Sequence, residues 1–234
     1  MSIKSNIEYV NELKNAAAEK SGRTGEDVLL VAVTKLHSPE EINEAIDAGV
    51  TDIGENKVQE ILDKYDKVKP VRWHLIGHLQ TNKVKYIIDK VCLIHSVDSL
   101  HLAKEIDKRA AQHDLTMDIL VQVNSAEEES KFGVTTEETD QLIEDIAQQC
   151  PNVRIRGLMC IAPFEENPDD AKPYFAQVKK IYDKYAAKKT DRIDFSYLSM
   201  GMTNDFEAAI EEGSNLIRVG TAIFGYRDYR SEEK

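Results

Sequence analysis

The chain has 234 residues, a length that can bury a hydrophobic core without disulfides or metals. Its 42 acidic and 30 basic residues give a formal net charge of −12, which disfavours binding to nucleic acid or to an anionic membrane. No segment reaches the roughly 18 continuous apolar residues of a membrane span, and the N-terminus lacks the apolar core of a signal peptide. We therefore expect a cytoplasmic protein. The three cysteines form no Cys-x-x-Cys pair, which predicts free thiols.

Amphipathic stretches with recognisable ends predict helices. The first carries apolar side chains at helical spacing, at Ile3, Ile7, Val10 and Leu13, and precedes the first apolar segment. A capping box at residues 38–41 opens a helix that ends near Gly49, and a second at 135–138 opens a helix through residue 146. A further helix is expected to open at residues 204–207 and to stop at Gly213.

Eight short apolar segments alternate with these stretches. They are residues 28–35, 52–56, 72–77, 93–97, 118–123, 155–161, 195–200 and 215–219. Most are rich in Val, Ile or Leu, as parallel strands buried on both faces are. Eight strands alternating with helices predict an α/β fold, a (β/α)8 TIM barrel with an extra N-terminal helix, formed as one domain over residues 1–234. A doubly wound sheet is disfavoured because the first strand runs into residues 34–37 without a glycine.

Lys35 ends the first predicted strand, at the end of a barrel where active sites lie. Burial lowers the pKa of a lysine and makes its neutral amine available to form an imine with an aldehyde. The alternatives are a lysine that reaches solvent or one that pairs with Glu55.

Two turns with small residues follow the last two predicted strands: Ser199-Met200-Gly201 and Gly220-Thr221. Glycine lets backbone amides approach an anion, and barrels of this kind often bind phosphate after strands seven and eight. These turns therefore predict a phosphate site, although glycines also simply end strands.

Arg218 lies within the last apolar segment, where its guanidinium requires acceptors. It is predicted either to face a ligand or to pair internally with Glu55 or Asp205. His74 and His78 are four residues apart, but their segment reads as a strand without a carboxylate motif, so no metal site is expected.

Ordered motifs along nearly the whole chain resemble those of the pyridoxal phosphate homeostasis proteins, single-barrel relatives of the alanine racemase N-terminal domain. The motifs lie at residues 30–35, 54–60, 73–83, 95–99, 131–133, 157–159, 198–202 and 217–225. The resemblance implies pyridoxal 5′-phosphate (PLP) as the cofactor, bound to Lys35 as a Schiff base. Phosphate would be held by Ser199 and by the amides around Gly220 and Thr221, with Met200 and Gly201 in the same turn.

The resemblance also implies that Arg218 faces the pyridine nitrogen and that Asn56, His78 and Met159 line the open side of the cofactor. Alanine racemases have a second domain that supplies a tyrosine base, and we expect none here because no sequence follows residue 234. We therefore expect no catalytic residues and a role in PLP homeostasis and supply, with PLP-dependent apo-enzymes as recipients. A PLP-dependent racemase and a Schiff-base aldolase that binds a phosphosugar are the alternatives. The charged helices show no apolar seam, which favours a monomer.

Overall fold

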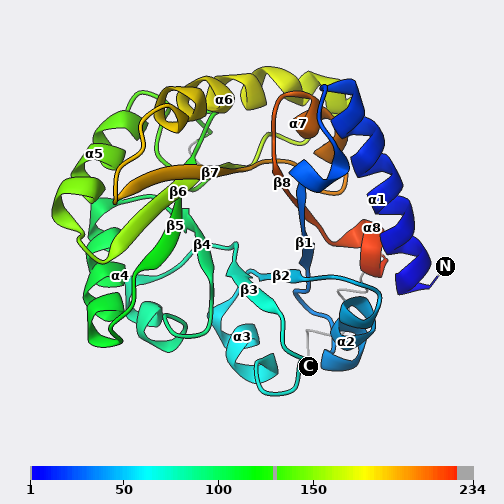
Figure 1. Ribbon diagram of the computed structural model, residues 1–234, viewed down its shortest axis with the longest axis horizontal. Helices are drawn as coiled ribbons and strands as arrows, with labels where there is room; N and C mark the ends of the chain where they lie inside the picture. The colour runs from blue at the N-terminus through cyan, green and yellow to red at the C-terminus, as the bar shows by residue number, and fades with distance from the viewer. Residues whose placement is uncertain (1, 129–130, 226–234) are drawn as a thin grey trace.

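The computed structural model describes residues 2–128 and 131–225 and shows a closed barrel of eight parallel strands in chain order (Figure 1). The strands are β1 (Leu29–Val33), β2 (Asp52–Glu55), β3 (Arg72–Leu75), β4 (Leu93–Val97), β5 (Met117–Val123), β6 (Val153–Cys160), β7 (Ile193–Ser199) and β8 (Leu216–Val219). The barrel closes where β8 pairs with β1. The (β/α)8 prediction and the approximate positions of all eight strands are confirmed.

Helices surround the strands in Figure 1. They are α1 (Ile3–Lys20), α2 (Pro39–Asp47), α3 (Val58–Lys64), α4 (Leu100–Gln112), α5 (Thr139–Gln149), α6 (Lys172–Ala186), α7 (Phe206–Glu211) and α8 (Thr221–Phe224). Three 3-10 helices complete the connections: η1 (Gly25–Asp27), η2 (Thr81–Tyr86) and η3 (Pro168–Ala171). Within the described ranges, no helix combines the length and the apolar character needed to cross a membrane.

The predicted helix ends are largely confirmed. Ser38 and Glu41 form the reciprocal bonds of a capping box at the start of α2. Thr135 and Glu138 form the same bonds, but these close a separate turn, and α5 begins only at Thr139. The predicted start of that helix is therefore wrong by three residues.

The predicted N-terminal helix, α1, lies against α7 and α8, which follow it by almost the full length of the chain (Figure 1). The side-chain amide of Asn6 donates to the carbonyl oxygen of Ile223 at 2.8 Å. Just after α1, the Arg23 guanidinium donates to the carbonyls of Ile210 and Ser214, where helix α7 ends. These bonds hold the segment after α1 against the end of α7.

Hydrophobic side chains pack in two layers. The larger layer lies between the strands and the helices. A smaller cluster fills the barrel interior with side chains from five strands: Val31, Leu93, Leu120, Met159 and Leu216. Because side chains alternate along a strand, residues two positions after an inward-facing one also point into the barrel. On β8 this alternation places Arg218 in the interior beside Leu216.

The described residues form one closed barrel. The single domain predicted for residues 1–234 also includes residues 1, 129–130 and 226–234, which lie outside the described part of the chain. The domain boundary therefore stays a prediction.

Candidate functional site

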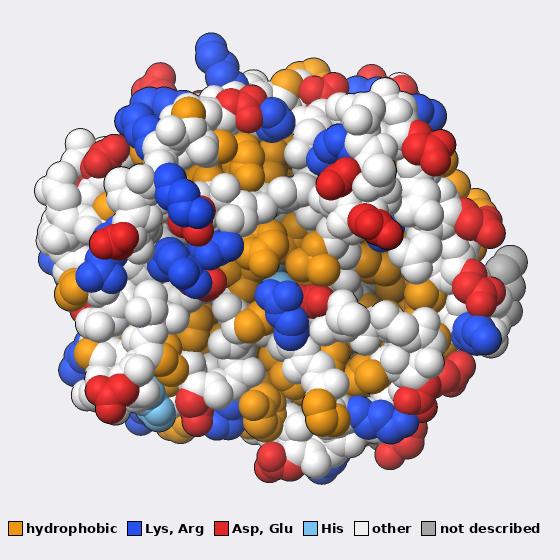
Figure 2. All heavy atoms as spheres, viewed as in Figure 1, with side chains coloured by type: hydrophobic (Ala, Val, Ile, Leu, Met, Phe, Trp, Pro, Cys, Tyr) orange, Lys and Arg blue, Asp and Glu red, His pale blue; other side chains and the backbone are white. Residues whose placement is uncertain are grey.

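A cavity of about 250 Å³ opens where strands β1, β6 and β8 end. Four of the predicted site residues line it: Lys35, Arg218, Gly220 and Thr221. Its other lining residues are Val33, Ala162, Pro163, Phe164, Glu165, Pro168, Ala171, Met202, Thr203, Asn204 and Asp205. Figure 2 shows hydrophobic side chains in a hollow at the centre of one face, with Lys or Arg side chains among them. The cavity lies at the carboxyl end of the barrel, where this fold builds its sites.

The position of Lys35 is set by the residues on either side of it. Strand β1 ends at Val33, so Lys35 lies just beyond the strand rather than at its last position. The hydroxyl of Thr34 donates to Glu55 Oε1 at 2.7 Å, and the amide of Leu36 donates to Glu60 Oε2 at 2.6 Å. Leu36 has φ of 65°, an unusual conformation for a residue other than glycine. The residues on both sides of Lys35 are thus held by carboxylates of β2 and α3, Thr34 through its side chain and Leu36 through its backbone amide.

Lys64 of α3, rather than Lys35, contacts the carboxylates beside the end of β1. Its ammonium contacts Glu55 Oε1 and Glu60 Oε2, each at 2.8 Å, and donates to the carbonyl of Thr34 at 3.0 Å. Burial raises the pKa of Glu55 against the attraction of Lys64. Among the described residues, Glu55 forms its ion pair with Lys64, so the predicted alternative of a Lys35–Glu55 pair is not the arrangement found.

Arg218 is a buried cation with neutral partners. It is 3% exposed, and its guanidinium donates to Ser199 Oγ and, at 2.9 Å, to the carbonyl of Cys160. Among the described residues, none of the ion pairs within 4 Å involves Arg218, so the predicted pairing with Glu55 or Asp205 is not formed. Burial lowers the pKa of Arg218. Asp205 on the same wall attracts the guanidinium without forming a direct ion pair. A buried charge without a contacting counter-ion is costly, and a bound anion would offset that cost.

The two predicted phosphate-binding turns differ in what they face. Gly220 and Thr221 line the cavity at the start of α8, whose first internal bond is donated by Ile223. The backbone amides of Gly220 and Thr221 therefore donate no hydrogen bond within α8 and can face an anion. Ser199 is fully buried instead, with its hydroxyl beside Arg218.

Gly201 has a structural reason to be glycine. Its φ is +91°, and a Cβ there would lie 2.7 Å from the Cα of Phe206 and from the Cβ of Ala209. Its carbonyl accepts the backbone amide of Arg218 at 3.0 Å, while Met200 is buried in the core. Among the described residues, the lining of the cavity does not include Ser199, Met200 or Gly201.

The remaining predicted residues lie away from this lining. Asn56 is half-buried, and its carbonyl oxygen would be 2.3 Å from a Cβ at Gly77, which explains that glycine. His78 stacks on Phe132 with ring centroids 3.9 Å apart, in a separate hollow. Met159 belongs to the cluster in the barrel interior. Their predicted contacts with a cofactor stay predictions.

The sequence reasoning missed several residues of the wall, among them Phe164, Glu165 and Asn204. They belong to the loops after β6 and β7. The general rule that loops at the carboxyl ends of the strands form barrel sites could have found them. Asp205, considered only as a partner for Arg218, also lines the cavity, and burial raises its pKa.

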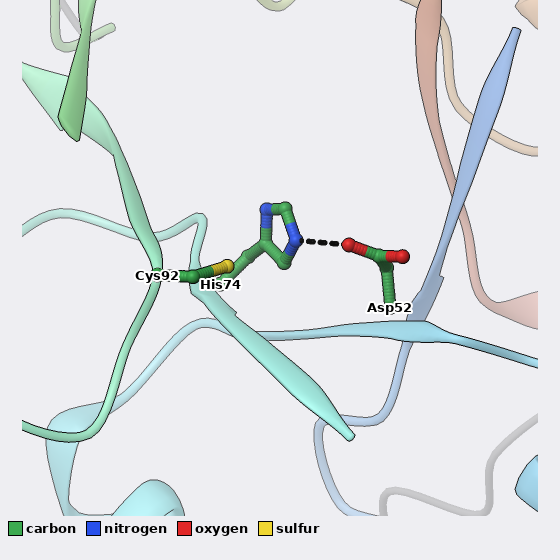
Figure 3. Close-up of side chains that lie close together, drawn as sticks. All are labelled: Asp52, His74 and Cys92. Atoms are coloured by element: carbon green, nitrogen blue, oxygen red, sulfur yellow. Dashed lines mark hydrogen bonds and ion pairs between the residues drawn. The ribbon is translucent and has the colours of Figure 1, made fainter.

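His74 and His95 form a hydrogen-bond network in the barrel interior that no local sequence pattern predicted. His74 lies inside the barrel, with its Nε2 2.8 Å from Asp52 Oδ1 and its Nδ1 2.9 Å from His95 Nε2. Figure 3 shows Asp52, His74 and Cys92 close together. Their potential ligand atoms lie within 4.8 Å of one another.

A metal site is nevertheless not supported by this cluster. Both nitrogens of His74 already have hydrogen-bond partners, and the guanidinium of Arg72 lies 3.4 Å from Asp52 Oδ1, where a cation would compete with a metal ion. His78, the other histidine of the spacing noted above, is 37% exposed and lies 3.9 Å from Asp98.

The chain matches the profile of a family described as "Alanine racemase, N-terminal domain" over residues 10–228. It is 43% identical over 225 residues to the pyridoxal phosphate homeostasis protein of Aquifex aeolicus, covering 95% of this chain and 97% of that one. It is 37% identical over 233 residues to the protein of the same name from Escherichia coli K12, covering 97% of each.

Solved structures share the fold of this chain. PipY of Synechococcus elongatus PCC7942, solved with PLP bound, superposes with a TM-score of 0.79 at 31% identity, covering 96% of this chain and all of that one. An unknown protein from Bifidobacterium adolescentis gives a TM-score of 0.89 at 35% identity, covering 95% and 94%. Alanine racemase from Corynebacterium glutamicum shares the fold, with a TM-score of 0.68 at 13% identity over 96% of this chain and 62% of that enzyme.

Proposed function

The chain belongs to the alanine racemase N-terminal domain family and, within it, to the pyridoxal phosphate homeostasis proteins, and from this premise we propose that it binds PLP and takes part in PLP homeostasis and supply. PLP carries a phosphate and an aldehyde. Lys35 and the turn at Gly220 and Thr221, which line one cavity, match the aldehyde and the phosphate respectively. The structure of PipY with PLP bound supports the same cofactor for this chain.

The observation that carries the proposal is the unpaired charge of Arg218 beside Lys35. Both line the same cavity, and among the described residues no ion pair neutralises Arg218. We assign Lys35 to the Schiff base with the cofactor aldehyde and Arg218 to the pyridine nitrogen. The amides of Gly220 and Thr221 would hold the phosphate, in the manner of other barrels that bind phosphate after strands seven and eight.

The second turn takes a supporting role in this proposal. Ser199 gives Arg218 an acceptor for its guanidinium, and Gly201 gives it an acceptor for its backbone amide. Direct contact of Ser199, Met200 and Gly201 with phosphate stays a prediction, as do the contacts of Asn56, His78 and Met159 with the cofactor.

Arg218 also bears on whether the protein is an enzyme. A guanidinium cannot accept a proton, so a pyridine nitrogen that faces it stays unprotonated, and the cofactor is then a weaker electron sink. Two-base proton transfer also needs a second acid or base opposite the lysine. The titratable groups on the described wall besides Lys35 and Arg218 are Glu165 and Asp205, with no tyrosine or histidine. These features support storage and supply of PLP over turnover.

The proposal extends to partners and location. PLP-dependent apo-enzymes are the expected recipients, and we propose a monomer in the cytoplasm. The free thiols of Cys92, Cys150 and Cys160 suit a reducing compartment. Sedimentation analysis at several protein concentrations tests the monomer directly, because self-association would raise the weight-average mass with concentration.

Visible absorption spectroscopy tests the proposal. Added PLP is expected to give the purified protein a Schiff-base band that borohydride removes and that Lys35→Ala lacks. Lys104→Ala, which changes an exposed lysine of α4, is the matched control and is expected to keep the band. A wild-type protein whose spectrum PLP does not change would exclude the proposal and favour the phosphosugar alternative. α-Hydrogen exchange of an amino acid at enzymatic rates would favour the racemase.

A further inference from the structure

A chain of hydrogen bonds crosses the interior of the barrel. It runs from Asp52 at the start of β2 to His74 (2.8 Å), from His74 to His95 (2.9 Å), and from His95 Nδ1 to Ser199 Oγ (3.0 Å) at the end of β7. Ser199 in turn accepts from Arg218, which lines the cavity. All five side chains are buried. The chain therefore connects the amino-terminal end of the barrel with the candidate cofactor site.

We propose that Asp52, His74 and His95 are positioning residues for the cofactor site, and that the protonation state of His74 sets the direction of the hydrogen bonds that reach Ser199. This inference rests on the proposed PLP site only for its effect on ligand binding. The reversal of these hydrogen bonds is itself a property of the protein without ligand.

With His74 neutral, every hydrogen in the chain has one consistent position. Asp52 is acceptor-only, so His74 donates from Nε2 and must accept at Nδ1. His95 therefore donates from Nε2 and accepts the hydroxyl hydrogen of Ser199 at Nδ1. Ser199 Oγ accepts from Arg218. In this state the hydroxyl hydrogen of Ser199 is committed to His95 and is not available to a ligand.

One added proton reverses the central bonds. The Nε2 hydrogen of His95 passes to His74 Nδ1, and the added proton is held at His95 Nδ1, so that His74 carries the positive charge. His95 then donates to Ser199 Oγ, which also accepts from Arg218, and both lone pairs of that oxygen are used. The hydroxyl hydrogen of Ser199 is released from His95, and in the predicted contact of Ser199 with the cofactor phosphate it can be donated to that anion. An anionic ligand should therefore bind more tightly when His74 is protonated.

Four groups face His74, and two of them, Asp52 and Cys92, favour this proton. They are Asp52 on β2, Arg72 on the same strand as His74, His95 on β4, and Cys92 just before β4. Burial opposes the charge, but the bonds to Asp52 and Cys92 leave the pKa of His74 raised above its ordinary value.

His95 itself is expected to stay neutral overall. It faces His74, Ser199 and Arg218, and its ring lies fully buried. Burial, together with the charges of His74 and Arg218, holds the pKa of His95 well below its ordinary value. The two histidines therefore bind one added proton between them, and the resulting positive charge lies on His74.

The first test uses the ligand-free protein. In histidine labelled with ¹⁵N, NMR shifts report which ring nitrogen carries hydrogen, and they can be followed from about pH 5 to about pH 8. We expect His95 to change from the Nε2–H to the Nδ1–H form as His74 becomes protonated. Asp52→Asn, which keeps the shape of the side chain and removes its charge, should move this change to lower pH. A His95 tautomer that does not follow the titration of His74 would overturn the inference.

The second test measures PLP binding at the same pH values. The expected result is that Asp52→Asn binds PLP about 10-fold more weakly than the wild type at the acidic end and nearly equally at the alkaline end, a loss corresponding to one lost charged hydrogen bond. A ratio that does not change with pH would contradict the inference, because a merely structural defect would weaken binding at every pH.

His113→Gln is the matched control, since it removes an exposed histidine at the end of α4. It should leave both the His95 tautomer and the PLP affinity unchanged. Absence of any Schiff-base band in the wild type would refute the PLP proposal. The NMR titration would still decide whether the hydrogen bonds between His74, His95 and Ser199 reverse their direction.

Discussion

Two buried cations in this barrel, Lys64 and Arg218, have opposite surroundings. Lys64 contacts two carboxylates at 2.8 Å and a backbone carbonyl, and so is neutralised within the protein. Arg218 is bound by a hydroxyl and a carbonyl, both neutral, at the wall of a cavity. Burial alone therefore does not identify a ligand-binding cation. The distinguishing feature is whether carboxylates of the protein contact the cation directly.

The largest effect on stability is expected at the buried ion pairs of Lys64. Lys64→Met leaves Glu55 buried without its counter-ion, and removal of one partner of a buried pair costs about 3–5 kcal/mol in the free energy of unfolding. Urea denaturation measures the loss. The double variant Glu55→Gln/Lys64→Met should recover a large part of it, because no uncompensated charge is left. A loss below about 1 kcal/mol for the single variant would place this pair with ordinary surface ion pairs.

Arg218→Met should give the reverse pattern. The free energy of unfolding of the ligand-free protein should fall by no more than about 1–2 kcal/mol, since only neutral partners lose a hydrogen bond and a buried charge is removed. PLP retention should fall strongly, with a changed Schiff-base spectrum. Urea denaturation and spectroscopic titration on one preparation separate the two effects. Unchanged affinity and spectrum would remove Arg218 from the proposed site.

The Asp52–His74 pair should contribute to the free energy of unfolding by an amount between those of Lys64 and Arg218, because the ion pair exists only while the ring of His74 is protonated. The pKa of His74 is raised in the folded protein, so its contribution to stability is present below about pH 6.5 and is lost as pH rises through the folded-state pKa. Wild type should therefore lose its stability advantage over His74→Gln as pH rises. Denaturation of both proteins across this range measures it, and an advantage that grows with pH would contradict the assignment.

The smallest effect is expected at a lysine whose ion pair is exposed. Lys69 contacts Asp47 at 2.5 Å, but the two side chains are 50% and 62% exposed. Lys69→Met should change the free energy of unfolding by less than about 1 kcal/mol, since exposed ion pairs contribute little. It is a matched control for Lys64→Met in the same denaturation experiment. Similar losses for the two variants would mean that burial of the pair is not what matters.

The sequence by itself determined the repeated architecture and the two cations of the candidate site. Apolar segments and capping residues are local signals, so they located eight strands and most helix ends. Lys35 and Arg218 stood out because a charged residue within or at the end of an apolar segment is costly unless it has a use. Family motifs along the chain then indicated PLP.

Only the tertiary structure decided which buried charges are paired. Glu55 and Lys64 are nine residues apart, yet their pairing also fixes the backbone beside Lys35. The bond between His95 and Ser199 joins residues 104 positions apart. Such contacts depend on the register of parallel strands around a closed barrel and on which side chains point inward. Local sequence patterns carry no information about that register, because each strand is joined to the next by a helix or loop.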